Sequence, residues 1–95
     1  MIRNIVLLEL KEGAGEEDVE RIRRALLAID FPERENFSMG RDIGVREDNM
    51  DVAILADFPD VDSYQRWNDN PEHNRVRAEV IAPVVERIER CQYSV

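Results

Sequence analysis

The sequence has one cysteine, one histidine and one tryptophan, and these scarcities exclude several classes of protein. Cys91 cannot form an internal disulfide, and its strand-like surroundings predict an inert thiol. A single histidine without a cysteine pair lacks the ligands of a zinc site, so no metal is expected. There is no glycine-rich phosphate loop and no Ser/His/Asp order typical of a hydrolase. No bound cofactor is therefore predicted.

Long apolar runs and excess positive charge are missing too. The first ten residues are apolar but too few to cross a bilayer, and they lack the layout of a signal peptide. The net charge of −8 and the pI of about 4.6 would repel phosphate backbones and anionic lipid. We therefore expect neither nucleic acid nor a membrane as partner, and a cytoplasmic location.

The 95 residues contain no linker, repeat or low-complexity segment, which predicts a single domain over residues 1–95. An apolar stripe of Val19, Ile22, Leu26 and Ile29 indicates one helix. Pro83 interrupts a later apolar pattern, where it must kink or restart the helix. The sequence patterns predict strands at 2–10, 37–46, 50–58 and 89–95, and helices at 15–29, 61–69 and from Pro71 onward.

This order predicts an α+β domain of ferredoxin-like βαββαβ type, with helices on one side of a four-stranded antiparallel sheet. The first strand carries apolar residues on both faces, with Val6 and Leu8 on one and Ile5 and Leu7 on the other. The helices can cover only one face. We therefore expect a homodimer joined through the open sheet face, in which two sheets form a dimeric α/β barrel.

The segment 64–73 carries the candidate site. Asn70 and Pro71 are typical of a helix end followed by a new helix start. This places Trp67 in the last turn of the first helix and His73 in the first turn of the second. Since imidazole titrates near pH 6.5, His73 is the candidate catalytic residue. The alternatives are a histidine with a local structural hydrogen bond and a tryptophan that packs between helix and sheet.

Two further residues are candidates for the pocket wall. Tyr64 lies one helical turn before Trp67, where its ring would be half-buried and its hydroxyl wet. Asn4 lies on an otherwise apolar strand, and a buried amide needs hydrogen-bond partners. Asn4 could therefore be part of a polar pocket wall, or it could make a purely structural hydrogen bond, and the sequence leaves both roles open.

Three regions resemble the stress-responsive dimeric α/β-barrel (Dabb) family in order and spacing, namely 1–13, 36–42, and 57–58 together with 64–73. The resemblance spans nearly the whole chain and implies a dimeric barrel. In members with pocket chemistry, such as plant polyketide cyclases, it implies an acid–base pair of tyrosine and histidine. His73 matches that histidine, whereas Trp67 stands at the tyrosine position, and an indole N–H cannot replace a phenol in acid–base chemistry.

Two other positions differ from the family pattern. Asn4 stands where the family commonly has histidine, and Gln92 stands about where an aspartate orients the catalytic histidine. Glutamine accepts a hydrogen bond but does not stabilise imidazolium as a carboxylate does.

Three functions follow from these patterns. The first is a small homodimeric stress-responsive barrel that binds a small organic molecule, with acid–base, lyase- or cyclase-like chemistry on an enolisable carbonyl compound. The second is a non-catalytic, stress-linked oligomeric protein. The third is a cofactor-free monooxygenase-like or haem-binding barrel, with His73 as the ligand.

Overall fold

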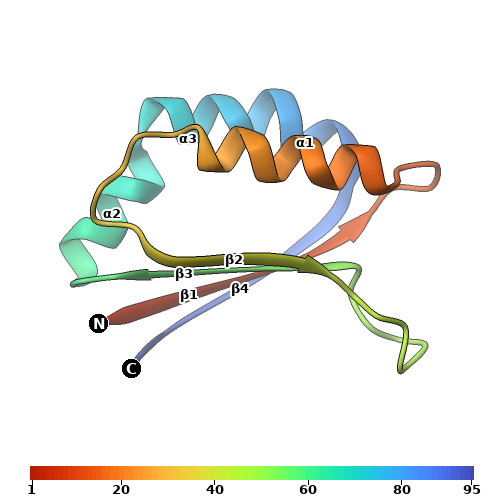
Figure 1. The fold of residues 1–95 in the computed structure, drawn as a ribbon, viewed down its shortest axis with the longest axis horizontal. Coiled ribbons are helices and arrows are strands. Elements are labelled where there is room, and N and C mark those ends of the chain that lie inside the picture. The colour runs from red at the N-terminus through yellow and green to blue at the C-terminus, as the bar shows by residue number, and fades with distance from the viewer.

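The computed structural model describes residues 1–95 as a sheet with one layer of helices (Figure 1). All strand pairs are antiparallel and the order is β2-β3-β1-β4. No helix is sufficiently long and apolar to cross a membrane. The elements are β1 (Ile2–Leu10), α1 (Glu16–Leu27), β2 (Glu35–Arg41), β3 (Val52–Phe58), α2 (Val61–Asp69), α3 (Pro71–Val76), a π-helical turn (Arg77–Ile81), a 3-10 turn (Ala82–Val84) and β4 (Val85–Ser94).

The ferredoxin-like α+β fold predicted from the sequence is confirmed, with two differences at strand ends. The predicted strand 37–46 is wrong at its end, because β2 stops at Arg41. Residues 42–51 instead form a projecting loop, in which Ile43 is 88% exposed. The Asp42 carboxylate closes this loop by accepting hydrogen bonds from the Gly44 N–H at 3.0 Å and the Asn49 amide at 3.0 Å.

The last strand begins at Val85 rather than at residue 89. Pro83 lacks the N–H that a continuing helix needs, so the helical segment tightens into a 3-10 turn and ends there. An apolar residue recurs every four positions at Val76, Val80, Val84 and Ile88, which is a spacing typical of a helix. Ile88 instead pairs with Leu8 across β1 and β4. An apolar residue every four positions also falls on one face of a strand, so the spacing alone could not separate the two structures.

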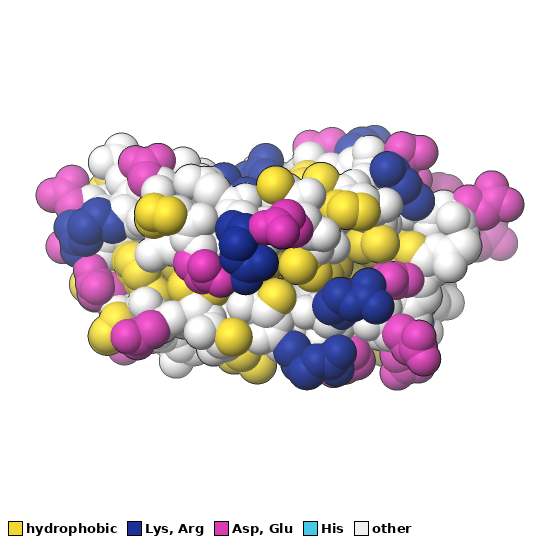
Figure 2. Space-filling view, turned by 90° about the horizontal axis from the view of Figure 1, so that it is seen from above, with side chains coloured by type: hydrophobic (Ala, Val, Ile, Leu, Met, Phe, Trp, Pro, Cys, Tyr) yellow, Lys and Arg dark blue, Asp and Glu magenta, His cyan; other side chains and the backbone are white.

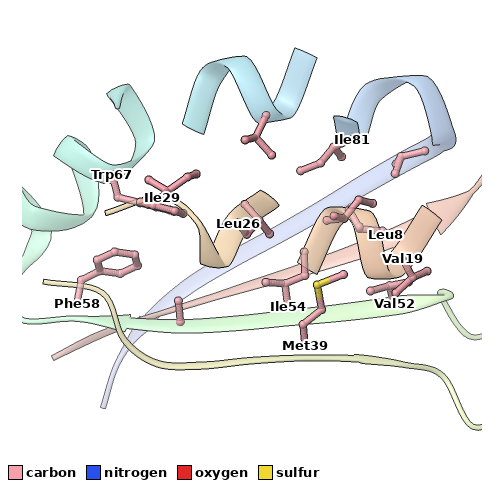
Figure 3. Packing of buried hydrophobic residues seen from close by; sticks show 14 residues of the cluster. Leu8, Val19, Leu26, Ile29, Met39, Val52, Ile54, Phe58, Trp67 and Ile81 are labelled. Carbon is pink, nitrogen blue, oxygen red and sulfur yellow. The ribbon is translucent and has the colours of Figure 1, made fainter. Parts of the chain in front are cut away.

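The core lies between the sheet and the helices (Figure 3). The stripe of Val19, Ile22, Leu26 and Ile29 is buried there, as its spacing predicts. The predicted helix 15–29 is too long at its end, because α1 stops at Leu27 and Ile29 follows it in the chain. Figure 3 shows Phe58 and Trp67 at one end of this core, with Ile29 between sheet and helix. The buried apolar residues are Leu8, Val19, Ile22, Leu26, Ile29, Met39, Val52, Ile54, Ala56, Phe58, Trp67, Val76, Ile81 and Val85.

The opposite face of the sheet is covered by no element of this chain (Figure 1). Its centre is apolar, because Ile5 pairs with Leu55 on β3 and with Cys91 on β4. Leu7 lies on the same face and is half-buried within the single chain. We call these residues, Ile5, Leu7, Leu55 and Cys91, the open-face cluster.

A buried ion pair lies on the same face. Asp57 is 1% exposed, and its two oxygens accept hydrogen bonds from Arg3 Nε at 2.8 Å and Nη2 at 2.9 Å. Asn36, at φ 53° in a bulge of β2, donates a third at 2.8 Å. The hydrogen bonds from Arg3, which is the larger cause, and from Asn36 lower the pKa of Asp57 to about 2. The face therefore combines an apolar centre with a buried carboxylate whose charge is paired.

Candidate functional site

The joint between α2 and α3 fixes the candidate histidine. The Asn70 side-chain oxygen accepts a hydrogen bond from the backbone N–H of His73 at 3.0 Å. Pro71 occupies the first turn, where its missing N–H costs nothing. The cap and the proline together define the start of α3, so His73 has a fixed position relative to α2.

His73 stacks on Trp67, with ring centroids 4.0 Å apart and an angle of 23° between the planes. Its Nδ1 lies 2.9 Å from the carbonyl oxygen of Trp67. An Nδ1–H that donates to this carbonyl leaves the lone pair on Nε2. Arg77 lies along the imidazole, with its Nη2 2.9 Å from Nδ1 and its Nε 3.4 Å from Nε2.

This environment holds His73 in its neutral form at pH 7. Burial, the largest cause, lowers its pKa from 6.5 to about 4. The Trp67 carbonyl opposes the shift, while the positive charges of Arg77, Arg34 and Arg90 add to it. The imidazole is therefore neutral at pH 7, with Arg77 Nε 3.4 Å from its Nε2, and it is a weaker base than an ordinary histidine.

Titration of the single histidine tests this electrostatic description. We expect its Hε1 proton resonance to titrate with a midpoint near pH 4. Because the unfolded chain takes up this proton near 6.5, the free energy of unfolding should fall as pH drops from 6.5 toward 4, with no contribution from His73 above 6.5. His73→Gln should lose that part of the slope. A midpoint near the ordinary value would show that the imidazole is well solvated.

The imidazole lines a narrow pocket between the sheet and the helices, with a cavity volume of about 60 Å³. Most of the wall is apolar and comes from β1, β3, α1 and the turn after α3. The lining residues are Asn4, Val6, Leu8, Leu26, Arg34, Phe37, Ile54, Ala56, Tyr64, Trp67, Asn68, His73, Arg77, Ile81, Ile88 and Arg90.

The pocket brings together four of the five residues proposed from the sequence, namely His73, Trp67, Tyr64 and Asn4. Gln92 does not line it and makes no hydrogen bond to His73. Instead, its Nε2 donates to the Asn4 side-chain oxygen at 2.8 Å. This hydrogen bond satisfies the side-chain oxygen of the buried Asn4. The backbone carbonyl of Trp67, rather than Gln92, orients the histidine.

Sequence reasoning missed three arginines of the pocket, Arg34, Arg77 and Arg90. They come from the loop before β2, from the π-helical turn and from β4. The sequence could have indicated two of them. Arg77 lies four residues after His73 in a helical segment, so the two side chains share a helix face, and Arg90 shares a strand face with Gln92. Arg34 left none, since its place depends on how the loop returns to the sheet.

The fold and the pocket together define the class of protein: a ferredoxin-like α+β domain with a narrow pocket between sheet and helices. The chain belongs to the Stress responsive A/B Barrel Domain family, whose model matches residues 2–95. No curated protein matches it.

Solved structures support the same assignment. A dimeric ferredoxin-like protein of unknown function from Thermobifida fusca is 31% identical, with a TM-score of 0.85 over 99% of this chain and 90% of that chain. A Dabb family protein from Mesorhizobium loti is 26% identical, with a TM-score of 0.79 over 99% and 95%. The hydroxynitrile lyase from Passiflora edulis shares the fold, at 23% identity and a TM-score of 0.83 over 99% and 92%.

Proposed function

We propose that this protein is a homodimer that binds one small organic molecule per subunit in the pocket between sheet and helices. The observation that carries the proposal is the pocket itself, which is lined by 16 residues of which 10 are hydrophobic. This is the usual composition of a small-molecule site. The pocket is smaller than the roughly 300–1,000 Å³ typical of drug-sized ligands, so the ligand is small.

The homodimer is supported by the open-face cluster and by relatives described as dimeric. A sheet face with Ile5, Leu7 and Leu55 at its centre gains free energy when a second copy covers it. Such a pairing leaves the helix layers outside, so each subunit keeps its own pocket.

Acid–base chemistry on an enolisable carbonyl compound is the second candidate function. Two groups of the pocket favour it, the neutral imidazole of His73 and the hydroxyl-bearing ring of Tyr64. His73 Nε2 would take the proton from the carbon next to the carbonyl, and the resulting enolate oxygen would carry the charge. A base with a pKa of about 4 is weak for this step at pH 7, so binding is the primary proposal.

The residues present do not fit a haem. An iron ligand would have to be His73 Nε2, which lies 3.4 Å from the positively charged Arg77. The narrow cavity adds a second obstacle, because the porphyrin would displace the apolar wall. The haem-binding alternative therefore has no support in the geometry of this site.

One experiment tests both functions, with small enolisable ketones and aldehydes as probes. A bound probe should raise the melting temperature by mass action. If His73 moves the proton, the probe should also take up deuterium from D₂O next to its carbonyl. Ala56→Leu fills the pocket and should abolish both effects, whereas Ala28→Leu, at the exposed residue that follows α1, should abolish neither.

His73→Gln separates binding from chemistry. It should retain most of the thermal stabilisation and lower the deuterium uptake by about 10²–10⁴-fold. Deuterium uptake that survives in His73→Gln would refute the acid–base role alone. Stabilisation that survives in Ala56→Leu would place the ligand elsewhere, and a complete lack of binding would leave the non-catalytic oligomeric protein as the better description.

A further inference from the structure

The pocket is lined by three cationic side chains and by no carboxylate. This is unexpected in a chain with 21 acidic residues and 13 basic ones. Over the helix layer, Figure 2 shows acidic side chains interspersed with basic ones. The positive lining of the pocket is thus a local departure from an acidic protein.

These three arginines also lack ion-pair partners. Some surface arginines meet carboxylates, as Arg66 does with Glu33 at 2.5 Å and Arg75 with Glu72 at 2.5 Å. The exposed Arg24, Arg41 and Arg46 do not, but they are surrounded by solvent rather than by a cavity wall. Arg34, Arg77 and Arg90 take part in no ion pair. Three uncompensated positive charges around one narrow cavity repel each other, so an anion placed among them would be stabilised.

Two of the three arginines, Arg34 and Arg77, are held in place by hydrogen bonds to backbone carbonyls. Arg34 Nη1 donates to the Leu26 carbonyl at 2.7 Å, and its guanidinium lies 5.0 Å from the Trp67 ring. Arg77 Nη2 donates to the Asn68 carbonyl at 2.6 Å. Arg90 donates to no group of the protein, so its guanidinium has all its hydrogen-bond donors available. Guanidinium groups bind carboxylates with charge-assisted, often bidentate, hydrogen bonds.

We propose that the ligand of this pocket is a small organic acid, whose carboxylate lies among Arg34, Arg77 and Arg90 and whose apolar body contacts the wall formed by Val6, Ile54 and Ile81. This inference rests on the proposed binding function and names its ligand class. The apolar wall selects the body of the ligand, and the arginines select its charge. The carboxylate would also raise the pKa of His73, because a negative charge nearby favours the imidazolium form.

Isobutyrate and benzoate, each compared with its primary amide, test the proposal. The amides keep the shape and remove the charge. Binding is followed through the single tryptophan indole N–H and the single histidine Hε1 resonance. We expect each carboxylate to bind at least about 10-fold more tightly than its amide, with a raised His73 pKa. Arg90→Gln should weaken carboxylate binding about 10-fold and change amide binding less than about twofold.

Arg24→Gln is the matched control, because Arg24 is exposed on α1, forms no ion pair and does not line the pocket. It should bind the carboxylates as the natural chain does.

Equal binding of acid and amide would overturn the anion inference but leave the pocket function intact. If inorganic phosphate bound as tightly as benzoate, the apolar body of the ligand would contribute nothing. The pocket would then be an adventitious anion site only, and the proposal would be wrong. A pocket that binds none of these probes and none of the carbonyl compounds would refute the proposed function itself.

Discussion

Replacement of Leu7 by aspartate is expected to convert the protein from a dimer into a monomer of 11.1 kDa. Leu7 lies on the open-face cluster, between Ala53 on β3 and Glu89 on β4. By symmetry each dimer would bury two new carboxylates without partners, and each buried, unpaired charge costs several kcal/mol. The dimer should therefore weaken by on the order of 10²–10³-fold or more. Light scattering over a dilution series measures the change.

Leu27→Asp provides the control for this substitution. Leu27 is 52% exposed at the end of α1, in the layer of helices that faces away from the proposed interface. The same chemical change there should leave the dimer intact. Both variants should keep the far-ultraviolet circular dichroism of the natural chain, since neither position belongs to the buried core. A natural chain that scatters as an 11.1 kDa particle at working concentrations would end the dimer proposal.

Replacement of Trp67 by alanine is expected to lower the free energy of unfolding by about 3–5 kcal/mol. Trp67 is 4% exposed, and the centroid of its ring lies 5.3 Å from the ring centroid of Phe31 and 6.1 Å from that of Phe58. Small domains have about 5–15 kcal/mol of stability in total, so the loss is a large fraction of it. Urea unfolding followed by circular dichroism measures it, because the variant has no tryptophan left to fluoresce.

The same variant should change the site. Without the indole the stacked face of His73 is open to water, so its pKa should rise from about 4 toward 6.5. Trp67→Phe keeps an aromatic face and should keep more of both the stability and the low pKa. Val61→Ala on the same helix, 53% exposed, should change stability by less than about 0.5 kcal/mol. A cost below about 1 kcal/mol for Trp67→Ala would mean that the indole is not a core residue.

The amino-acid sequence determined the helices most firmly, because their signals are local. The apolar stripe of α1 and the Asn70–Pro71 joint depend on residues within two turns of each other, and α2 and the start of α3 lie where these signals place them. Apolar residues on both faces of β1 predicted a sheet covered on both sides for the same reason. The strand ends were less certain, since strand length depends on partners distant in sequence, as the early stop of β2 shows.

Only the tertiary structure decided the character of the pocket. The sequence placed Trp67 and His73 at one joint, and the fold added a stack of 4.0 Å and a neutral imidazole. Arg34 and Arg90 are 56 residues apart in the sequence, and only the return of the loop and of β4 brings them to the same cavity. Charge in a site depends on which side chains the fold places together without counter-ions, and no local pattern carries that information.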